Sequence, residues 1–277
     1  QPNAQDNFTL DASFNAVANS TYILKATANL AGDPVITNNS ASATVVISQP
    51  PVADNLAAYY CSDSKNYILT GSGDGELLWY QNAGDAIPIA WGTTGLTGQP
   101  PVNNTYYAGL NDFSGSVGPA TKNVFTGGGY DQFTPGIKVN TRIPLIIESA
   151  RLYVGNAGAI TFNVSDASGR VVSTTTINTA ATRTTPASGA QPDDPNDQGK
   201  VYNLNLLLPA AGSYTIGISY DATATIYRNN AGVTGYPFKI GDVFSIYGNE
   251  ASDAGDTAVY KKYYYYLYDI KVKSAGC

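Results

Sequence analysis

Residues 260–277 read YKKYYYYLYDIKVKSAGC, and this closing stretch does most to decide the kind of fold. With a period of two, one of its faces stays apolar while the other turns polar toward the end. The apolar face carries Tyr264, Tyr266, Tyr268, Ile270 and Val272, and the other carries Tyr263, Tyr265, Leu267, Asp269, Lys271 and Lys273. This alternation predicts one long β-strand over residues 260–272, buried on one side and partly covered on the other.

The composition of the whole chain predicts the same class of structure. Charged residues make up 13% of the 277 residues, and the chain uses 21 Tyr and 28 Gly together with abundant Thr, Asn and Val. Sparse charge with many aromatic and β-branched residues favours short strands joined by polar turns. No helical periodicity of three turns or more is visible, so we predict an all-β fold built from tandem β-sandwiches.

Breaks in the strand pattern divide the chain into three predicted units. Residues 1–49 predict a short strand within 8–14 and strands at 20–28 and 41–47, and they read as the C-terminal part of a β-sandwich. A proline pair then forms a stiff linker. Residues 50–110 carry Cys61 on one strand and Trp79 on a later one, a pattern typical of immunoglobulin-like (Ig-like) domains. Residues 111–277 predict a flexible entry at 125–130 and about nine strands, among them 202–208 and 213–220. They are typical of a larger, jelly-roll-like β-sandwich.

Charge and residue usage exclude several classes of function. The net charge is −6, and the 15 Lys and Arg residues do not cluster, so no nucleic-acid partner is expected. No apolar run approaches the roughly 20 residues of a transmembrane helix. No His is present, which excludes Ser-His-Asp and Cys-His catalysis and His-based metal sites, and we predict that the chain is not an enzyme. No signal peptide is visible, and we expect a mature or excised piece of a longer protein.

The long loop Thr179–Gly199 contains the densest group of oxygen ligands. Asp193, Asp194, Asn196 and Asp197 place three carboxylates and an amide within five residues. Calcium takes roughly six to eight hard oxygen ligands, so these residues are a candidate calcium site, although their spacing fits no EF-hand. The alternative is a solvated acidic loop, with no cofactor.

A second candidate site surrounds one turn late in the chain. Tyr227, Arg228, Asn229, Asn230 and Tyr236 combine two rings, a cation and two amides. This mixture of groups suits the edge of a saccharide, because an aromatic face can pack on a sugar ring while polar groups bind hydroxyls. The alternative is that both tyrosines are core rings and that the asparagines hold turn conformations.

Several stretches resemble parts of a known class of surface protein. Cys61, GSGDG at 71–75, Trp79-Tyr80 and TYY at 105–107 resemble the Ig-like repeats of very large Bacteroidetes surface proteins, which the type IX system secretes. Tyr22–Ile47 resembles the tail of a CARDB-like adhesion module. Three later stretches resemble a sandwich module found within such proteins: GGYDQF at 128–133, ESARLYVG at 148–155, and YRNNAG at 227–232 with GYPF at 235–238.

This resemblance implies an extracellular, cell-surface protein of the adhesin or gliding-motility type. The implied function is non-catalytic: a spacer and contact surface, whose partners are extracellular surfaces, glycans or neighbouring copies of the same protein. The alternative function is that of a carbohydrate-binding, lectin-like module, calcium-dependent if the acidic loop holds the ion.

The resemblance also implies a disulfide. In plain repeats of that family a Gly-Cys pair soon follows the Tyr-Tyr strand and closes the Ig-like unit. Here Gly276-Cys277 would be that pair, displaced by the inserted sandwich. We therefore predict a disulfide between Cys61 and Cys277, in line with an even number of cysteines in an exported protein. The alternative is two unpaired thiols whose partners lie outside this chain.

A short modification pattern precedes the last strand. Asp256-Thr257-Ala258 matches the Asp-Ser/Thr-apolar pattern used for O-glycosylation in Bacteroidetes, so the resemblance implies a glycoprotein modified at Thr257. The surrounding Gly, Asp and Ser residues predict an exposed loop. The alternative is a chance match, because the pattern is only three residues long.

Overall fold

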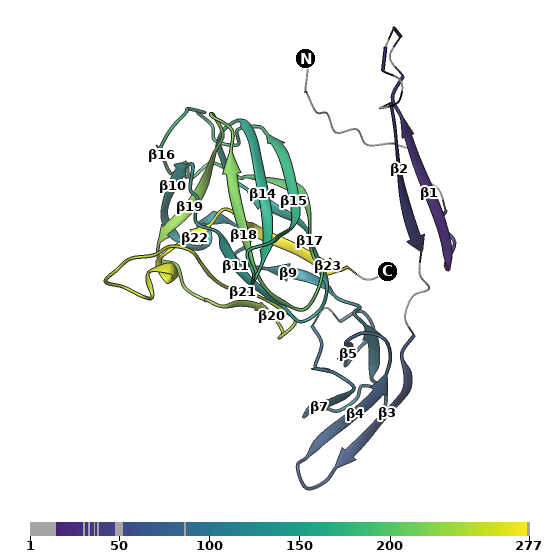
Figure 1. Ribbon diagram of the computed structural model, residues 1–277. Coiled ribbons are helices and arrows are strands. Elements are labelled where there is room, and N and C mark those ends of the chain that lie inside the picture. The colour runs from purple at the N-terminus through teal and green to yellow at the C-terminus, as the bar shows by residue number, and fades with distance from the viewer. Residues whose placement is uncertain are drawn as a thin grey trace. The chain divides into compact units, whose positions relative to one another are not determined.

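The computed structural model describes residues 15–275, apart from positions 30, 33, 36, 38, 48–51 and 86. The chain divides into two compact units, one up to Pro51 and the other Val52–Gly276. Antiparallel strands dominate both (Figure 1), and the longest described helix is a 3-10 helix of four residues. The predicted all-β class is confirmed. Among the described residues, no helix has the length and apolar character needed to cross a membrane.

The first unit is described as one β-hairpin. Its strands β1 (Ser20–Thr27) and β2 (Ser40–Ile47) pair antiparallel, with Tyr22 opposite Val45. Both strands lie where the alternation of apolar and polar residues predicted them, to within one residue. The side chain of Ile23 is 74% exposed, so the described part of this unit buries little apolar surface. The additional strand predicted within residues 8–14 lies outside the described residues.

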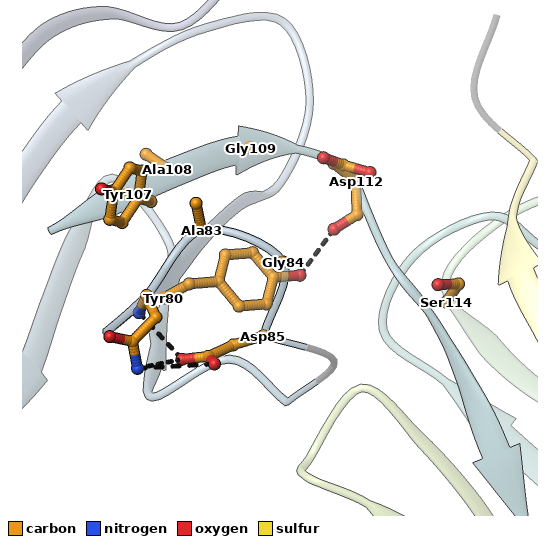
Figure 2. Close-up of a pocket in the computed structure, with 10 residues that line it drawn as sticks. Tyr80, Ala83, Gly84, Asp85, Tyr107, Ala108, Gly109, Asp112 and Ser114 are labelled. Atoms are coloured by element: carbon orange, nitrogen blue, oxygen red, sulfur yellow. Dashed lines mark hydrogen bonds between the residues drawn. The ribbon is translucent and has the colours of Figure 1, made fainter.

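Two three-stranded sheets open the second unit. Their strands are β3 (Asp54–Cys61), β4 (Asn66–Ser72) and β7 (Thr94–Thr97) in one sheet, and β6 (Ala90–Trp91), β5 (Leu77–Tyr80) and β8 (Tyr107–Leu110) in the other. All four side chains of β5 are buried, because its two faces meet different cores. Leu77 and Trp79 pack with Leu69, whereas Leu78 and Tyr80 join the large core that follows. The hydroxyl of Tyr80 donates to the carbonyl of Asp112 (Figure 2).

A β-sandwich forms the bulk of the second unit. The larger sheet has the order β15-β14-β18-β11-β21-β20 and the smaller one β17-β12-β23-β9. Their strands are β9 (Ser114–Val117), β11 (Ile137–Thr141), β12 (Leu145–Leu152), β14 (Gly158–Asp166), β15 (Val171–Thr179), β17 (Lys200–Leu208), β18 (Gly212–Tyr220), β20 (Phe238–Ile240), β21 (Phe244–Asn249) and β23 (Tyr268–Ser274). Alternate residues of both sheets, such as Phe162 and Leu206, build one apolar core.

A third sheet of the second unit carries the candidate sites. Its order is β13-β19-β10-β16, with β22 paired to β19. The strands are β10 (Thr126–Asp131), β13 (Val154–Asn156), β16 (Gln191–Pro192), β19 (Thr225–Ala231) and β22 (Tyr264–Tyr265). A separate core packs here and is almost entirely aromatic: Phe125, Tyr130, Tyr153, Tyr227, Tyr264 and Tyr268.

The prediction of one long strand over residues 260–272 is wrong. The stretch begins as a 3-10 helix, η3 (Val259–Lys262), continues as β22 and, after a break, becomes β23 in a different sheet. At the break Tyr266 has φ +29° and the amide of Leu267 donates to the carbonyl of Tyr265 over 2.7 Å. Because residues 264–268 are all buried, alternation between a covered and an open face cannot hold there, and the chain passes between two cores instead.

The glycine run at 125–130, predicted to be a flexible entry, is also a strand. It forms β10, between β19 and β16. A Cβ at Gly128 would collide with the ring of Tyr227, and one at Gly129 would lie 2.7 Å from the carbonyl oxygen of Gln191. These glycines permit close approach of a neighbouring strand and a ring, which is their role inside sheets.

The predicted limits of the domains remain predictions. The compact units divide after Pro51, close to the predicted linker. The separation of an Ig-like domain at 50–110 from a sandwich at 111–277 is not decided by the compact units, because both ranges fall in the second one. Gly276 and Cys277, the predicted closing element of the Ig-like domain, lie outside the described residues.

Candidate functional site

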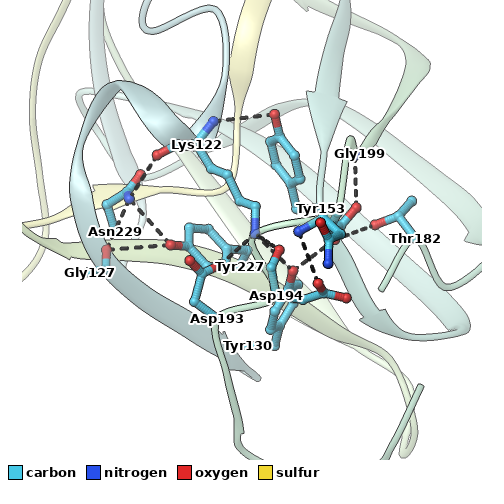
Figure 3. A network of polar contacts seen from close by, with 12 residues as sticks. Lys122, Gly127, Tyr130, Tyr153, Thr182, Asp193, Asp194, Gly199, Tyr227 and Asn229 are labelled. Atoms are coloured by element: carbon cyan, nitrogen blue, oxygen red, sulfur yellow. Dashed lines mark hydrogen bonds and ion pairs between the residues drawn. The ribbon is translucent and has the colours of Figure 1, made fainter. Parts of the chain in front are cut away.

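The most unusual group of the described residues is a buried lysine. Lys122 begins the short 3-10 helix η2 (Lys122–Val124), and its side chain is fully buried. Lysine is almost never buried in proteins unless it is paired. Here its ammonium forms an ion pair with Asp193 and donates to the backbone carbonyl of Asp194 (Figure 3).

Three tyrosine rings enclose the ammonium of Lys122. Its Nζ lies 4.6 Å from the ring centroid of Tyr227 and 5.5 Å from those of Tyr130 and Tyr153. At such distances the negative face of an aromatic ring attracts a cation. The Nζ also donates to the hydroxyl of Tyr130 over 3.3 Å. The lysine is therefore held by rings, a carboxylate and a carbonyl at the same time.

The acidic loop is folded around this lysine. One oxygen of Asp194 accepts from the amide and hydroxyl of Thr184 over 2.8 and 2.6 Å, and the other accepts from the amide of Asn196 over 3.0 Å. These hydrogen bonds, from the Thr184 hydroxyl first, hold the pKa of Asp194 below its usual value. Asp197 accepts from Tyr130 and Thr182 over 2.8 Å each.

Burial keeps the hydroxyl of Tyr130, which lies between Lys122 and Asp197, in its protonated form. Desolvation raises the pKa of Tyr130 above its ordinary value, and the hydrogen bond to Asp197 raises it further. Desolvation likewise raises the pKa of Tyr227. Tyr130 therefore remains a donor to Asp197 at neutral pH, while its oxygen accepts from Lys122.

These contacts bear on the predicted calcium site. Asp193, Asp194, Asn196 and Asp197 lie in one loop, yet a buried ammonium already provides the positive charge, and protein donors occupy the oxygens of Asp194 and Asp197. In this arrangement the four residues do not fit a calcium ion, which would have to displace those donors. Across the described residues, no group of three or more His, Cys, Asp and Glu is arranged to hold a metal.

The five residues predicted to bind a saccharide are separated in the structure. Tyr227 and Asn229 are 1% and 0% exposed, and Tyr236 packs against both the sandwich core and the separate aromatic core. The amide of Asn229 donates to the carbonyls of Lys122 and Gly127, and its oxygen accepts from Tyr268 over 2.7 Å. The two tyrosines pack against core residues, as the alternative interpretation expected, whereas Asn229 lies within the strand β19 and not in a turn.

Arg228 and Asn230 are the members within β19 that reach the surface. The guanidinium of Arg228 lies 4.1 Å from the ring centroid of Phe133 and 4.7 Å from that of Tyr263, and donates to the hydroxyl of Tyr265 over 3.1 Å. Asn230 lines a pocket of about 400 Å³ together with Asp256 and Lys262. The predicted saccharide site stays a prediction.

The predicted modification site lies beside that pocket. Thr257 is exposed, as predicted, and the neighbouring Asp256 and Ala258 line the pocket together with Asn230. The carboxylate of Asp256 pairs with Lys262 over 2.8 Å, which lowers its pKa. O-glycosylation of Thr257 stays a prediction.

Cys61 ends β3 and is partly exposed. Hydrogen bonds from the hydroxyl and amide of Ser64 lower the pKa of its thiol, which favours the reactive thiolate. Among the described residues Cys61 has no disulfide partner, and Cys277 lies outside them, so the predicted Cys61–Cys277 bond stays a prediction.

A pocket of about 350 Å³ that the sequence did not predict lies between the loop after β5 and the strand β8 (Figure 2). Tyr107, 43% exposed, lies at its edge, and Asn82, Asp85 and Asp112 contribute polar groups. The carboxylate of Asp85 accepts from the amide of Asn82 over 2.8 Å. Lys122 was missed as well, because a single lysine in a polar stretch gives no signal of burial.

Comparison with known proteins brings no match: no family model, no curated protein and no solved structure is significantly similar to this chain.

Proposed function

We propose that this chain is a non-catalytic part of a secreted cell-surface protein, in which it acts as a spacer and contact surface. The observation that supports a spacer most directly is the way in which partly or fully buried tyrosines hold the loops by hydrogen bonds. Tyr220 donates to the carbonyl of Phe133 over 2.6 Å, Tyr264 to that of Leu267 over 2.7 Å, and Tyr266 to that of Pro135. A module whose connections are tied to its core keeps its shape when it is pulled or pressed.

Desolvation preserves these tyrosine hydrogen bonds over a wide pH range. It raises the pKa of Tyr220, Tyr264 and Tyr266 above the usual value for tyrosine. The phenols therefore remain hydrogen-bond donors in neutral and mildly basic surroundings. Such tolerance suits a protein exposed to the medium outside the cell.

Labelling of cells tests the proposed location and role. Antibodies against the full chain should label intact source cells, and brief treatment with an external protease should remove the signal. Beads coated with the folded chain should be retained on surfaces that the cells colonise, whereas beads coated with heat-unfolded chain should be washed off. Labelling that requires permeabilised cells would contradict the proposal.

The alternative function, carbohydrate binding, is supported by the pocket between the loop after β5 and the strand β8. An exposed ring at its edge and amide and carboxylate groups beside it are the elements with which proteins bind sugars. On a glycan array, run with calcium and again with a chelator, binding should be lost in Tyr107→Ala. Tyr59→Ala, which removes an exposed tyrosine away from the pocket, is the matched control. Equal binding by both variants would exclude this pocket.

A further inference from the structure

We propose that Lys122 and Asp193 are joined by an intramolecular amide bond between Nζ and Cγ, an isopeptide crosslink. The two groups are in direct contact as an ion pair, although they lie 71 positions apart in the sequence. The lysine side chain is fully buried, and that of the aspartate is 36% exposed. This inference is independent of the proposed function, because it rests only on the chemistry around Lys122.

The surroundings fix the nitrogen where the reaction would need it. The rings of Tyr130, Tyr153 and Tyr227 enclose the ammonium, and the carbonyl of Asp194 accepts a hydrogen bond from it. A nucleophile held against the carbon that it attacks reacts as if it were present at very high concentration. The carboxylate of Asp193 is held in place as well, because the neighbouring Asp194 accepts hydrogen bonds from Thr184 and Asn196.

The reaction needs no further reagent. After the ammonium passes one proton to Asp193, the Nζ lone pair attacks Cγ, a C–N bond forms, one C–O bond breaks, and the oxygen departs as water. An ammonium and a carboxylate thus become a neutral amide and one water, with no change of oxidation state. Two protons leave the nitrogen, and both end on the departing oxygen. The partly exposed side of Asp193 gives that water a way out.

The structure provides a route for both protons. The first passes directly within the Lys122–Asp193 pair. The second has a path from Nζ to the hydroxyl of Tyr130, at 3.3 Å, and from there to Asp197, at 2.8 Å. Asp197 holds this proton while the tetrahedral intermediate breaks down, and then releases it toward the departing oxygen. Asp197 is therefore a positioned proton acceptor that does not touch the reacting atoms itself.

Burial also favours the product. A buried ion pair carries a desolvation cost that a hydrogen-bonded neutral amide avoids. The crosslink would tie the long loop before β17 to η2 and close the sheet formed by β10 and β16. The alternative outcome, an ordinary buried ion pair, leaves the two side chains unchanged, and the two outcomes differ in mass.

The mass of the full chain, folded and then denatured for measurement, decides between them. The crosslinked chain is lighter than its sequence by one water. A succinimide at Asp74-Gly75 would give the same loss, so tryptic peptides must locate it. With the crosslink, trypsin cannot cleave after Lys122, and residues 66–138 appear joined to residues 184–200. Recovery of a free peptide 66–122 from a chain of full sequence mass would overturn the proposal.

Variants test the assigned roles. Asp193→Ala should keep its full sequence mass, and Asp193→Asn should lose ammonia in place of water, because the same amide would form. Asp166→Ala, which removes a surface carboxylate paired with Arg170, should still lose water. Asp197→Asn should fold, as followed by circular dichroism, yet lose water far more slowly. Loss of water in Asp193→Ala would place the dehydration elsewhere and overturn the assignment.

Discussion

Asn229 shows how a residue that looks like a ligand contact can be a structural centre. It is fully buried and joins three segments of the chain: η2 through the carbonyl of Lys122, β10 through that of Gly127, and β23 through the hydroxyl of Tyr268. Replacement by an apolar residue would leave buried donors and acceptors without partners. Such groups cost more than the hydrogen bonds themselves contribute.

We therefore expect Asn229→Leu to lower the free energy of unfolding by about 3 kcal/mol. Urea denaturation followed by far-UV circular dichroism measures the change. Asn230→Ala is the matched control: its side chain is exposed, and substitutions of that kind usually change stability by less than about 0.5 kcal/mol. Equal effects at the two positions would mean that the network around Asn229 contributes little.

The hydrogen bonds of Asp221 lead to a prediction of how the free energy of unfolding depends on pH. Its carboxylate accepts from the amides of Ala159, Ala224 and Thr223, and these bonds, that of Ala159 first, lower its pKa to about 2. In the unfolded chain an aspartate has a pKa of about 3.9. The lowered folded-state pKa means that the stabilisation is complete above about pH 4 and is lost as the pH falls toward 2.

The wild-type free energy of unfolding should therefore decrease between about pH 4 and pH 2, and this decrease should be smaller in Asp221→Asn. A part should remain, because the hydroxyl of Ser168 and further hydrogen bonds also lower the pKa of Asp166 to about 2. Urea titrations at several pH values measure the slope. Asp74→Asn, an exposed position, should keep the wild-type slope. An unchanged slope in Asp221→Asn would refute this account.

At the scale of elements, strands that have one covered face could be predicted from the sequence. β17 and β18 lie within two residues of where alternation placed them, because each has residues that face a core and residues that face outward or a thinner layer. The prediction for the closing stretch, residues 260–272, failed for the opposite reason. Its tyrosines are buried on all sides, and a residue such as Tyr266 signals burial without telling which core it enters.

The candidate sites were harder to predict than the strands. The acidic loop was found from its composition, but its cation is Lys122, and no local pattern connects that lysine to Asp193. Tyr227 and Asn229 have side chains that serve a sugar site or a polar core equally well. Only the three-dimensional neighbours of these groups, which come from distant strands, decide between the two functions.

The acidic loop also carries a prediction about metal. Because protein donors occupy Asp194 and Asp197 and an ammonium pairs with Asp193, adding calcium or a chelator should leave the melting temperature unchanged. Differential scanning fluorimetry with calcium, with magnesium as the control ion, measures this. A calcium-specific rise that Asp194→Ala abolishes would show instead that the loop rearranges around the ion.

At the scale of the whole molecule, the second compact unit should unfold as one cooperative body. The predicted boundary near residue 110 crosses a continuous core, because Leu78 and Tyr80 pack in the same cluster as Phe113 and Val117. The guanidinium of Arg142 also lies 4.7 Å from the ring centroid of Trp91. A core shared in this way couples the two sides, so neither should unfold while the other persists.

The chain offers separate probes for the two sides. Both tryptophans, Trp79 and Trp91, lie in the small sheets, whereas most strands that dominate circular dichroism lie beyond residue 110. Tryptophan fluorescence and circular dichroism should therefore report the same urea midpoint. Leu78→Ala should lower both midpoints together, at a cost of about 2–5 kcal/mol, because it opens a cavity in the shared core. A tryptophan transition at lower urea would instead establish residues 50–110 as a domain that unfolds by itself.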